Sequence, residues 1–188
     1  MTQVQGESMV AAHGVGLRAV LLTLCVTEIT SWGVLYYAFA VLSPAISGDT
    51  GWSAAAVTAA FSAGLVIAAL SGIVVGRWLD RYGPRWIMTA GSVLGVATLC
   101  AVAAAPNYWC FLAAWIVAGL AMSGVFYAPA FAALTRWYGH RAIGALTVLT
   151  LVAGLASTVF APLTALLIDH MDWRTTYFAL AALLAVIT

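Results

Sequence analysis

The chain contains no lysine, and its seven arginines and six acidic residues make up only 7% of 188 positions. An ordinary soluble domain is roughly 25% charged. Hydrophobic residues account for 64% of the chain, and the formal net charge is only +1. This shortage of charge excludes a basic surface for nucleic acid and predicts a protein that crosses a membrane several times.

Residues that carry out catalysis or bind metals are also scarce. Cys25, Cys100 and Cys110 lie inside apolar runs without CxxC spacing, where cysteine acts as a small hydrophobic residue. The chain has no His-Glu-x-x-His sequence, no Walker lysine and no Gly-x-Ser-x-Gly sequence. Because metallopeptidases, ATP-driven transporters and serine hydrolases depend on these motifs, we predict no enzyme, no metal and no cofactor.

Six apolar runs are present, and about 20 helical residues are enough to cross a bilayer core. They cover residues 15–46, 53–75, 86–105, 108–135, 142–168 and 173 onward. The predicted fold class is therefore an all-α integral membrane protein with six transmembrane helices, preceded by a cytoplasmic tail over residues 1–14. The last run reaches only about 24 Å at 1.5 Å per residue, so we expect the chain to be truncated within helix 6.

The arginines predict how these helices are oriented. Six of them fall at the start of the first run or in the connections after the second and fourth: Arg18, Arg77, Arg81, Arg85, Arg136 and Arg141. Arg174 falls on the opposite side, together with Asp49, Asp169 and Asp172. Because arginine-rich loops stay in the cytoplasm, we predict a multi-pass protein of the cell membrane with a cytoplasmic N-terminus.

The connection 76–86, with the sequence GRWLDRYGPRW, is the densest patch of charge. It predicts a tight turn in water, in which Gly83 ends one helix and Pro84 begins the next. Asp80 lies three residues after Arg77, within reach of an ion pair on a helix end. A topological anchor explains the arginines, whereas a switch that breaks and remakes ion pairs also explains Asp80 and the flanking glycines.

Glu28 is an acidic residue deep inside the first apolar run. A charge at that depth costs about 2.5 to 3.5 kcal/mol, so Glu28 should face the protein interior or a water-filled cavity. Helical spacing places several residues on its face, and this face is predicted to form a cavity wall: Ser31, Trp32, Leu35, Tyr36 and Phe39. We predict that Glu28 binds a proton or a cationic part of a solute, with Trp32 and Tyr36 shaping the site. The alternative is a buried glutamate that only joins helices, among aromatic residues that only pack.

Two further patterns concern the helices around this face. Trp115, Gly119, Ser123 and Tyr127 recur at four-residue steps, and Pro129 predicts a kink just after them. Tyr127 is therefore a weaker candidate for solute binding. The small residues of Gly72-x-x-x-Gly76 have the spacing that lets two helices pack closely.

The connection 76–86 resembles the signature between helices 2 and 3 of the major facilitator superfamily, through Gly76, Asp80, Arg81, Gly83 and Arg85. Segments 51–53, 136–144 and 172–174 are also similar to members of that family. The run 51–85 is most similar to bacterial monocarboxylate and oxalate/formate-type porters. The resemblance implies one half of the family fold, a bundle of two inverted three-helix repeats, with the solute bound between two such halves.

The resemblance also implies a function and partners. It indicates the N-terminal half of a secondary transporter that moves a small organic solute by alternating access, with carboxylates as one candidate class. Asp80 and Arg81 would hold the two halves together on the cytoplasmic side in the outward-facing state. The expected partners are the solute, the lipid bilayer, and either a missing C-terminal six-helix half or a second copy. The alternative is a truncated or accessory six-span membrane protein without transport activity of its own.

Overall fold

The computed structural model describes the backbone of residues 2–187 and the side chains of residues 16–187, and this part of the chain contains only helices. The elements are α1 (Thr2–Trp32), the π-helix η1 (Gly33–Tyr37), α2 (Ala38–Thr50), α3 (Ala54–Tyr82), α4 (Pro84–Ala103), α5 (Tyr108–Val125), α6 (Tyr127–Tyr138), the 3₁₀-helix η2 (Gly139–Arg141), α7 (Ala142–Gly154), α8 (Ala156–His170) and α9 (Trp173–Ile187). The all-α prediction is confirmed. The predicted tail, residues 1–14, lies outside the described side chains.

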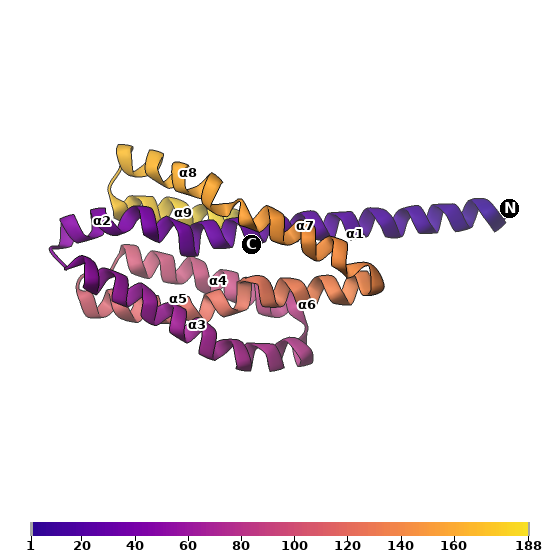
Figure 1. Cartoon of the computed structure of the whole chain (residues 1–188), viewed down its shortest axis with the longest axis horizontal. Helices are drawn as coiled ribbons and strands as arrows, with labels where there is room; N and C mark the ends of the chain where they lie inside the picture. The colour runs from indigo at the N-terminus through magenta and orange to yellow at the C-terminus, as the bar shows by residue number, and fades with distance from the viewer. Residues whose placement is uncertain (1, 188) are drawn as a thin grey trace.

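The helices lie side by side with their long axes roughly parallel (Figure 1). The α1 helix continues through η1 into α2, and the run Tyr108–His170 doubles back on itself at η2. Four described segments are long and apolar enough to cross a membrane: Gly16–Thr50, Ala54–Tyr82, Pro84–Ala103 and Tyr108–His170. Trp173–Ile187 is a shorter apolar helix. The structure thus has the apolar helices expected of a multi-pass membrane protein.

Glycines allow the central helix α5 to approach its neighbours closely. A β-carbon on Gly119 of α5 would overlap the backbone carbonyl of Gly64 on α3, and one on Gly91 of α4 would lie 2.8 Å from Val125. Gly72 behaves differently, because a β-carbon there would meet nothing within 4 Å, and the same holds for Gly76. Within the described residues, the prediction that this glycine pair packs against another helix is therefore wrong.

The extent of the predicted turn over 76–86 is also wrong. Helix α3 continues to Tyr82, and only Gly83 separates it from α4, which begins at Pro84. Val75 and Leu79 are buried one helical turn apart, so the α3 helix is held by packing beyond the start of the charged segment. The two roles predicted at the reversal are confirmed: Gly83 adopts φ +81°, and Pro84 occupies the first helical position.

Hydrogen bonds hold the start of α9 against the end of α4 and cap its first turn. The Arg174 guanidinium donates a hydrogen bond to the backbone carbonyl of Ala103, the last residue of α4, at 2.7 Å. It donates a second one to the carbonyl of Ala105, just beyond that helix, at 3.0 Å. Carbonyls at a helix C-terminus lack partners within the helix, and Arg174 supplies one. Asp172 caps α9 by accepting from the Thr175 backbone N–H at 2.8 Å and from its hydroxyl at 2.9 Å. These bonds hold the pKa of Asp172 below its usual value.

Candidate solute-binding site

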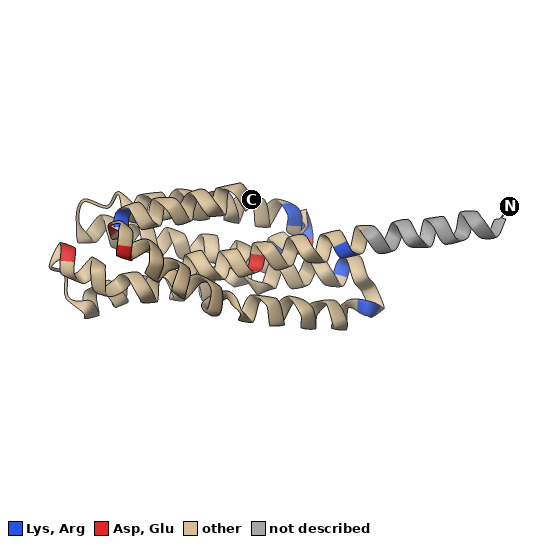
Figure 2. Ribbon diagram, turned by 90° about the horizontal axis from the view of Figure 1, so that it is seen from above, with Lys and Arg blue, Asp and Glu red and all other residues tan. Residues whose placement is uncertain are grey.

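Glu28 is buried inside the bundle, as predicted, and is 0% exposed. The Trp32 indole N–H, one helical turn later, donates to its Oε2 at 3.1 Å. Its Oε1 has no hydrogen-bond partner, and neither does the buried hydroxyl of Ser31 on the same face. Charged positions gather at the two ends of the bundle in Figure 2, whereas an acidic position of α1 lies midway along it. Buried oxygens without partners at this depth can accept a proton or a donor group of a ligand.

A π-helical turn follows directly on Trp32. In η1 the N–H of Ala38 bonds the carbonyl of Gly33, five residues earlier. A β-carbon on Gly33 would overlap the ring of Phe160 on α8, so glycine lets the two helices meet here. The wider turn changes the direction of the following side chains, and Tyr36 and Tyr37 are both half-buried with ring centroids 5.2 Å apart. Such turns are frequent at functional sites, and periodicity in the sequence did not reveal this one.

A break between α5 and α6 brings a second aromatic segment to Trp32. Phe126 has an extended backbone (φ −79°, ψ −170°). Pro129 cannot donate to the carbonyl of Val125, four residues earlier, and its ring crowds that carbonyl, so α5 ends there. The kink predicted at Pro129 therefore occurs three residues upstream. At the break, the Phe126 ring stacks on Trp32 with centroids 3.9 Å apart and an interplanar angle of 10°.

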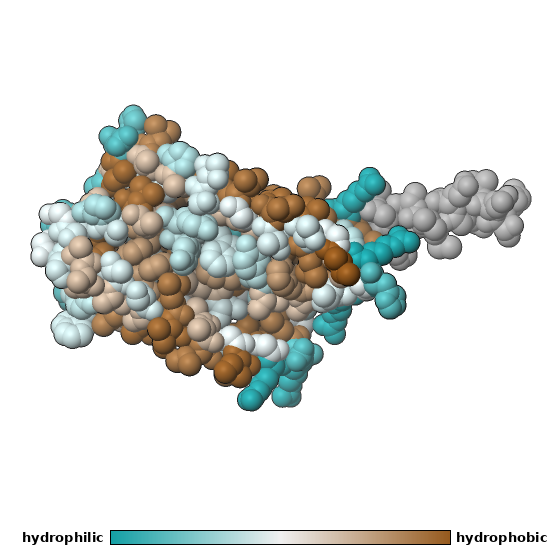
Figure 3. Space-filling model, viewed as in Figure 1, coloured by the Kyte–Doolittle hydropathy of each residue, from teal (hydrophilic) through white to brown (hydrophobic). Residues whose placement is uncertain are grey.

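These contacts define a half-buried aromatic cluster, whose members are Trp32, Tyr36, Phe126, Tyr127 and Phe131. Ring centroids are 5.5 Å apart for Trp32 and Tyr36, 5.2 Å for Trp32 and Tyr127, and 5.3 Å for Tyr127 and Phe131. The structure thus brings the predicted candidates Trp32, Tyr36 and Tyr127 together beside Glu28. Phe126 and Phe131 were missed, because only the break after α5 places them here. Pale, weakly polar side chains cross the middle of the face seen in Figure 3, between apolar ones.

Other residues of the two predicted aromatic stripes belong to the core. Leu35 and Phe39 are buried, and Phe39 stacks on Phe61 of α3 with centroids 4.1 Å apart. Trp115 is fully buried against these two rings, and Ser123 is also buried. The predicted cavity wall is therefore wrong at Leu35 and Phe39, because both side chains are buried in the core.

The charged connection places its side chains in solvent. Arg77, Asp80, Arg81 and Arg85 are all exposed, and no ion pair forms among the side chains of residues 16–187. The pair expected between Arg77 and Asp80 is therefore not formed. Asp80 instead lines a cavity of about 400 Å³ together with Arg136 of α6. The connection and the end of α6 thus lie next to each other at one end of the bundle.

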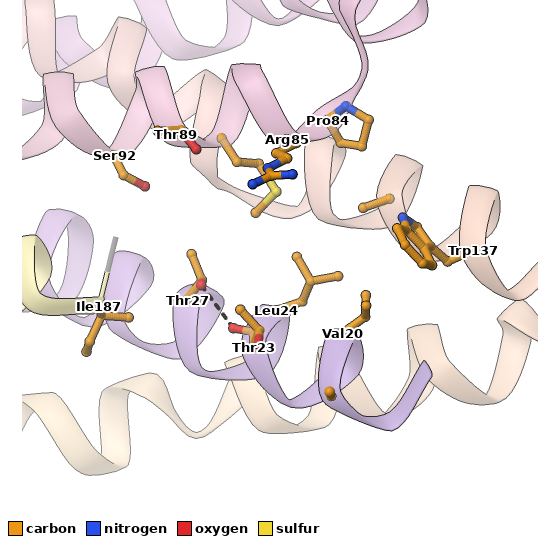
Figure 4. A pocket seen from close by; sticks show the side chains of 13 residues that line it. Val20, Thr23, Leu24, Thr27, Pro84, Arg85, Thr89, Ser92, Trp137 and Ile187 are labelled. Atoms are coloured by element: carbon orange, nitrogen blue, oxygen red, sulfur yellow. Dashed lines mark hydrogen bonds between the residues drawn. The ribbon is translucent and has the colours of Figure 1, made fainter. Parts of the chain in front are cut away.

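A second cavity, of about 420 Å³, opens between α1, α4 and α6 (Figure 4). Its lining is mostly apolar and includes Leu24, Met88 and Ile187, with Arg85 and Ser92 among the polar side chains. It contains neither Glu28 nor any member of the aromatic cluster. Of the residues predicted to bind solute or to form the conformational switch, this cavity therefore includes only Arg85.

The fold and this site define a class of protein. Apolar helices of membrane-crossing length, charge concentrated at the bundle ends and a buried carboxylate beside half-buried aromatic rings are features of a helical membrane transporter. The family model of the Major Facilitator Superfamily matches residues 21–188. The chain therefore belongs to this family of membrane transporters. Among the described residues, no group of three or more His, Cys, Asp or Glu side chains could hold a metal ion.

Proteins with transport functions are among its relatives. An MFS-type transporter of Gibberella moniliformis is 26% identical over 115 residues, which cover 61% of this chain and 28% of that protein. The riboflavin transporter of Saccharomyces cerevisiae is 33% identical over 101 residues, covering 53% and 19%. The fujikurins efflux protein of Gibberella fujikuroi is 28% identical over 89 residues, covering 47% and 19%. The matched segments thus span 19% to 28% of these relatives.

Proposed function

We propose that this chain is the N-terminal, six-span half of a secondary transporter that moves a small organic solute by alternating access. The observation that carries the proposal is Glu28, which is fully buried midway along a membrane helix with one oxygen unpartnered, beside a half-buried aromatic cluster. Buried carboxylates at this depth are costly, and transporters use them to bind ions and solutes. Membership in the transporter family supports the same function.

Glu28 has the surroundings of a group that binds a proton or a cationic part of the solute. An ionised carboxylate is costly within the hydrocarbon core, and the Trp32 N–H compensates only one of its oxygens. A proton or a donor on the second oxygen would lower that cost. In this proposal Trp32, Tyr36 and Tyr127 shape the site around the carboxylate.

The proposed topology has six membrane spans, formed by α1 with α2, α3, α4, α5 with α6, α7 with α8, and α9. The two halves of this bundle would be inverted three-helix repeats. Arginines gather toward one end of the bundle in Figure 2, and Arg174 lies at the other end, where it bonds the carbonyl of Ala103. By the positive-inside rule, this arrangement supports a cell-membrane protein with a cytoplasmic N-terminus.

The proposed solute is not restricted to carboxylates, the class suggested by the resemblance to monocarboxylate and oxalate/formate-type porters. Carboxylates stay a candidate, but among the described side chains no arginine makes a cation–π contact or a hydrogen bond with the aromatic cluster. A carboxylate would therefore need its positive partner from a second half or a second copy. Riboflavin belongs in any solute panel because one relative is named as its transporter.

A half-transporter of this kind would work with a second six-helix half or with a second copy of this chain. Sequencing the DNA downstream of the Thr188 codon tests the first arrangement: six further spans would support a transporter half. The alternative is a truncated or accessory six-span membrane protein without transport activity of its own, and a stop codon there would favour it.

Uptake by the full-length protein in proteoliposomes tests the role of Glu28. We expect a proton gradient to drive solute accumulation, and Glu28→Gln to abolish that dependence, because an amide cannot exchange the proton. Asp169→Asn is the matched control, since this exposed residue lies at the far end of the bundle. Unchanged pH-driven uptake by Glu28→Gln would show that Glu28 is not the coupling group.

A further inference from the structure

The aromatic cluster differs in depth and exposure from the aromatic residues of the core and from those near the helix ends. Phe61, Phe111 and Trp115 are buried in the core, and Trp86 and Trp109 lie exposed near helix ends, where membrane interfaces favour tryptophan. The rings of the cluster are half-buried and lie in the interior of the α1–α2 and α5–α6 runs. Neither core packing nor an interfacial belt explains rings in that position.

The geometry of the cluster suits a flat ring. Trp32 and Phe126 come from segments far apart in the chain, yet their rings are 10° from parallel at 3.9 Å. Tyr36 and Tyr127 approach Trp32 at angles of 65° and 42°. Offset stacking and edge-to-face contacts are the two arrangements that aromatic rings prefer, and the cluster offers both within one patch.

The polar atoms near the cluster are mostly acceptors or hydroxyls. Glu28 Oε1 and Ser31 Oγ are buried without partners. The hydroxyls of Tyr36, Tyr37 and Tyr127 make no hydrogen bond within the described part of the chain. No arginine side chain lies among them. A ligand at this position would find acceptors for N–H or O–H groups and no cation for a carboxylate.

We propose that the cluster binds a planar, conjugated ring bearing an N–H or O–H donor, an inference that rests on the proposed transport function. The ring packs against the half-buried faces of Trp32, Phe126 and Tyr127. Its donor group bonds the Oε1 of Glu28, the oxygen that the Trp32 indole leaves without a partner. Recognition by this half of the transporter therefore depends on ring planarity and a donor rather than on a negative charge.

Three probes of similar size separate these requirements. 2-Naphthamide has a flat ring and an N–H donor, decahydro-2-naphthamide has the donor without the flat ring, and 2-naphthoate has the flat ring with a carboxylate. Binding is measured by equilibrium dialysis against the full-length protein in lipid nanodiscs, with empty nanodiscs subtracting partition into lipid. We expect 2-naphthamide to bind about 3- to 10-fold more tightly than either other probe, the difference that one or two ring contacts supply.

Three variants test where the preference for a flat ring arises. Phe126→Leu removes one ring of the stack and should abolish the difference between 2-naphthamide and its saturated analogue. Phe178→Leu is the matched control, because Phe178 is an exposed ring on α9 outside the cluster. Phe126→Tyr, which keeps the ring, should keep the preference.

The proposal is overturned if the wild-type protein binds none of the probes, binds the flat and saturated amides equally or binds 2-naphthoate most tightly. It is also overturned if the preference survives in Phe126→Leu. Binding in nanodiscs does not require transport, so the planar-ring preference is judged separately from uptake. A protein that prefers 2-naphthamide but accumulates no solute would retain this inference and lose the proposed function.

Discussion

The indole N–H of Trp173 donates to the carboxylate of Asp49 at 2.9 Å, joining the start of α9 to the end of α2. Trp173 is 2% exposed, whereas Asp49 is on the surface. The bond therefore connects a buried ring to a solvated acceptor, and its net contribution should be modest. It complements the bonds from Arg174 to the end of α4, so α9 is fastened to two helices at the same end of the bundle.

Trp173→Phe should lower the free energy of unfolding by about 0.5 to 1.5 kcal/mol, because it removes the donor and keeps most of the buried ring. Equilibrium unfolding in a denaturing detergent measures this change. Trp109→Phe is the control, since the Trp109 side chain is 74% exposed and its indole N–H makes no hydrogen bond within the described residues. Equal losses in both variants would mean that the contact with Asp49 contributes nothing specific.

Gly119→Ala should destabilise the bundle by about 1 to 3 kcal/mol, the usual cost of overpacking. The added methyl group would overlap the Gly64 carbonyl and separate α3 from α5. Gly72→Ala makes the same chemical change on α3 where nothing lies within 4 Å. Its unfolding free energy should stay at or above that of the wild type, because alanine favours helix. A stable Gly119→Ala protein would contradict the close approach of the two helices.

The cap of α9 should contribute stability that depends on pH. Hydrogen bonds from Thr175 lower the folded-state pKa of Asp172 below 3.8, its usual value. The folded carboxylate thus binds a proton less readily than the unfolded one. The stabilisation is present above about pH 4 and is lost as the pH falls through the lowered folded pKa. Comparing unfolding midpoints at about pH 6 and pH 3 should show a smaller acid-induced loss for Asp172→Asn than for the wild type.

Asp169→Asn is the control for that comparison, because no hydrogen bond to the Asp169 side chain is found within the described residues. Its acid-induced loss should match that of the wild type. If Asp172→Asn shows the same loss as well, the cap does not account for the pH dependence.

Asp80→Asn should slow transport by the full-length protein without lowering its stability. Asp80 is exposed and forms no ion pair among the described side chains, so its removal breaks no contact in this structure. A switch residue would act through partners formed in another conformation. Transport rate and cysteine labelling of the cavity lined by Asp80 and Arg136 measure the effect. Unaltered rate and labelling would leave the connection only as a topological anchor.

The features that sequence predicted well depend on nearby residues. The helix end and helix start predicted at Gly83 and Pro84 are found there, because capping is decided within one helical turn. The position of Glu28 inside the bundle also follows from local spacing and the cost of charge in a membrane. These rules need no knowledge of the rest of the fold.

The features that sequence did not predict depend on contacts between distant segments. Phe126 reaches Trp32 only because α5 ends before Pro129 and α6 lies beside α1. The π-helical turn begins at Gly33, where the helix meets Phe160 of the distant helix α8. Gly72 and Gly76 have the spacing of a packing motif but face open space, since spacing alone does not say which side of a helix meets a neighbour.

Phe126, the non-helical residue between α5 and α6, lies at the start of the helix that joins the aromatic cluster to the cavity lined by Asp80 and Arg136. Phe126 holds the aromatic contact, and α6 extends from it for 12 residues, about 18 Å, to the neighbourhood of Arg136 and Asp80. A rotation of 10° about this point would displace the far end of α6 by about 3 Å. A change in backbone angle at Phe126 would therefore be felt beside Asp80, about 18 Å away.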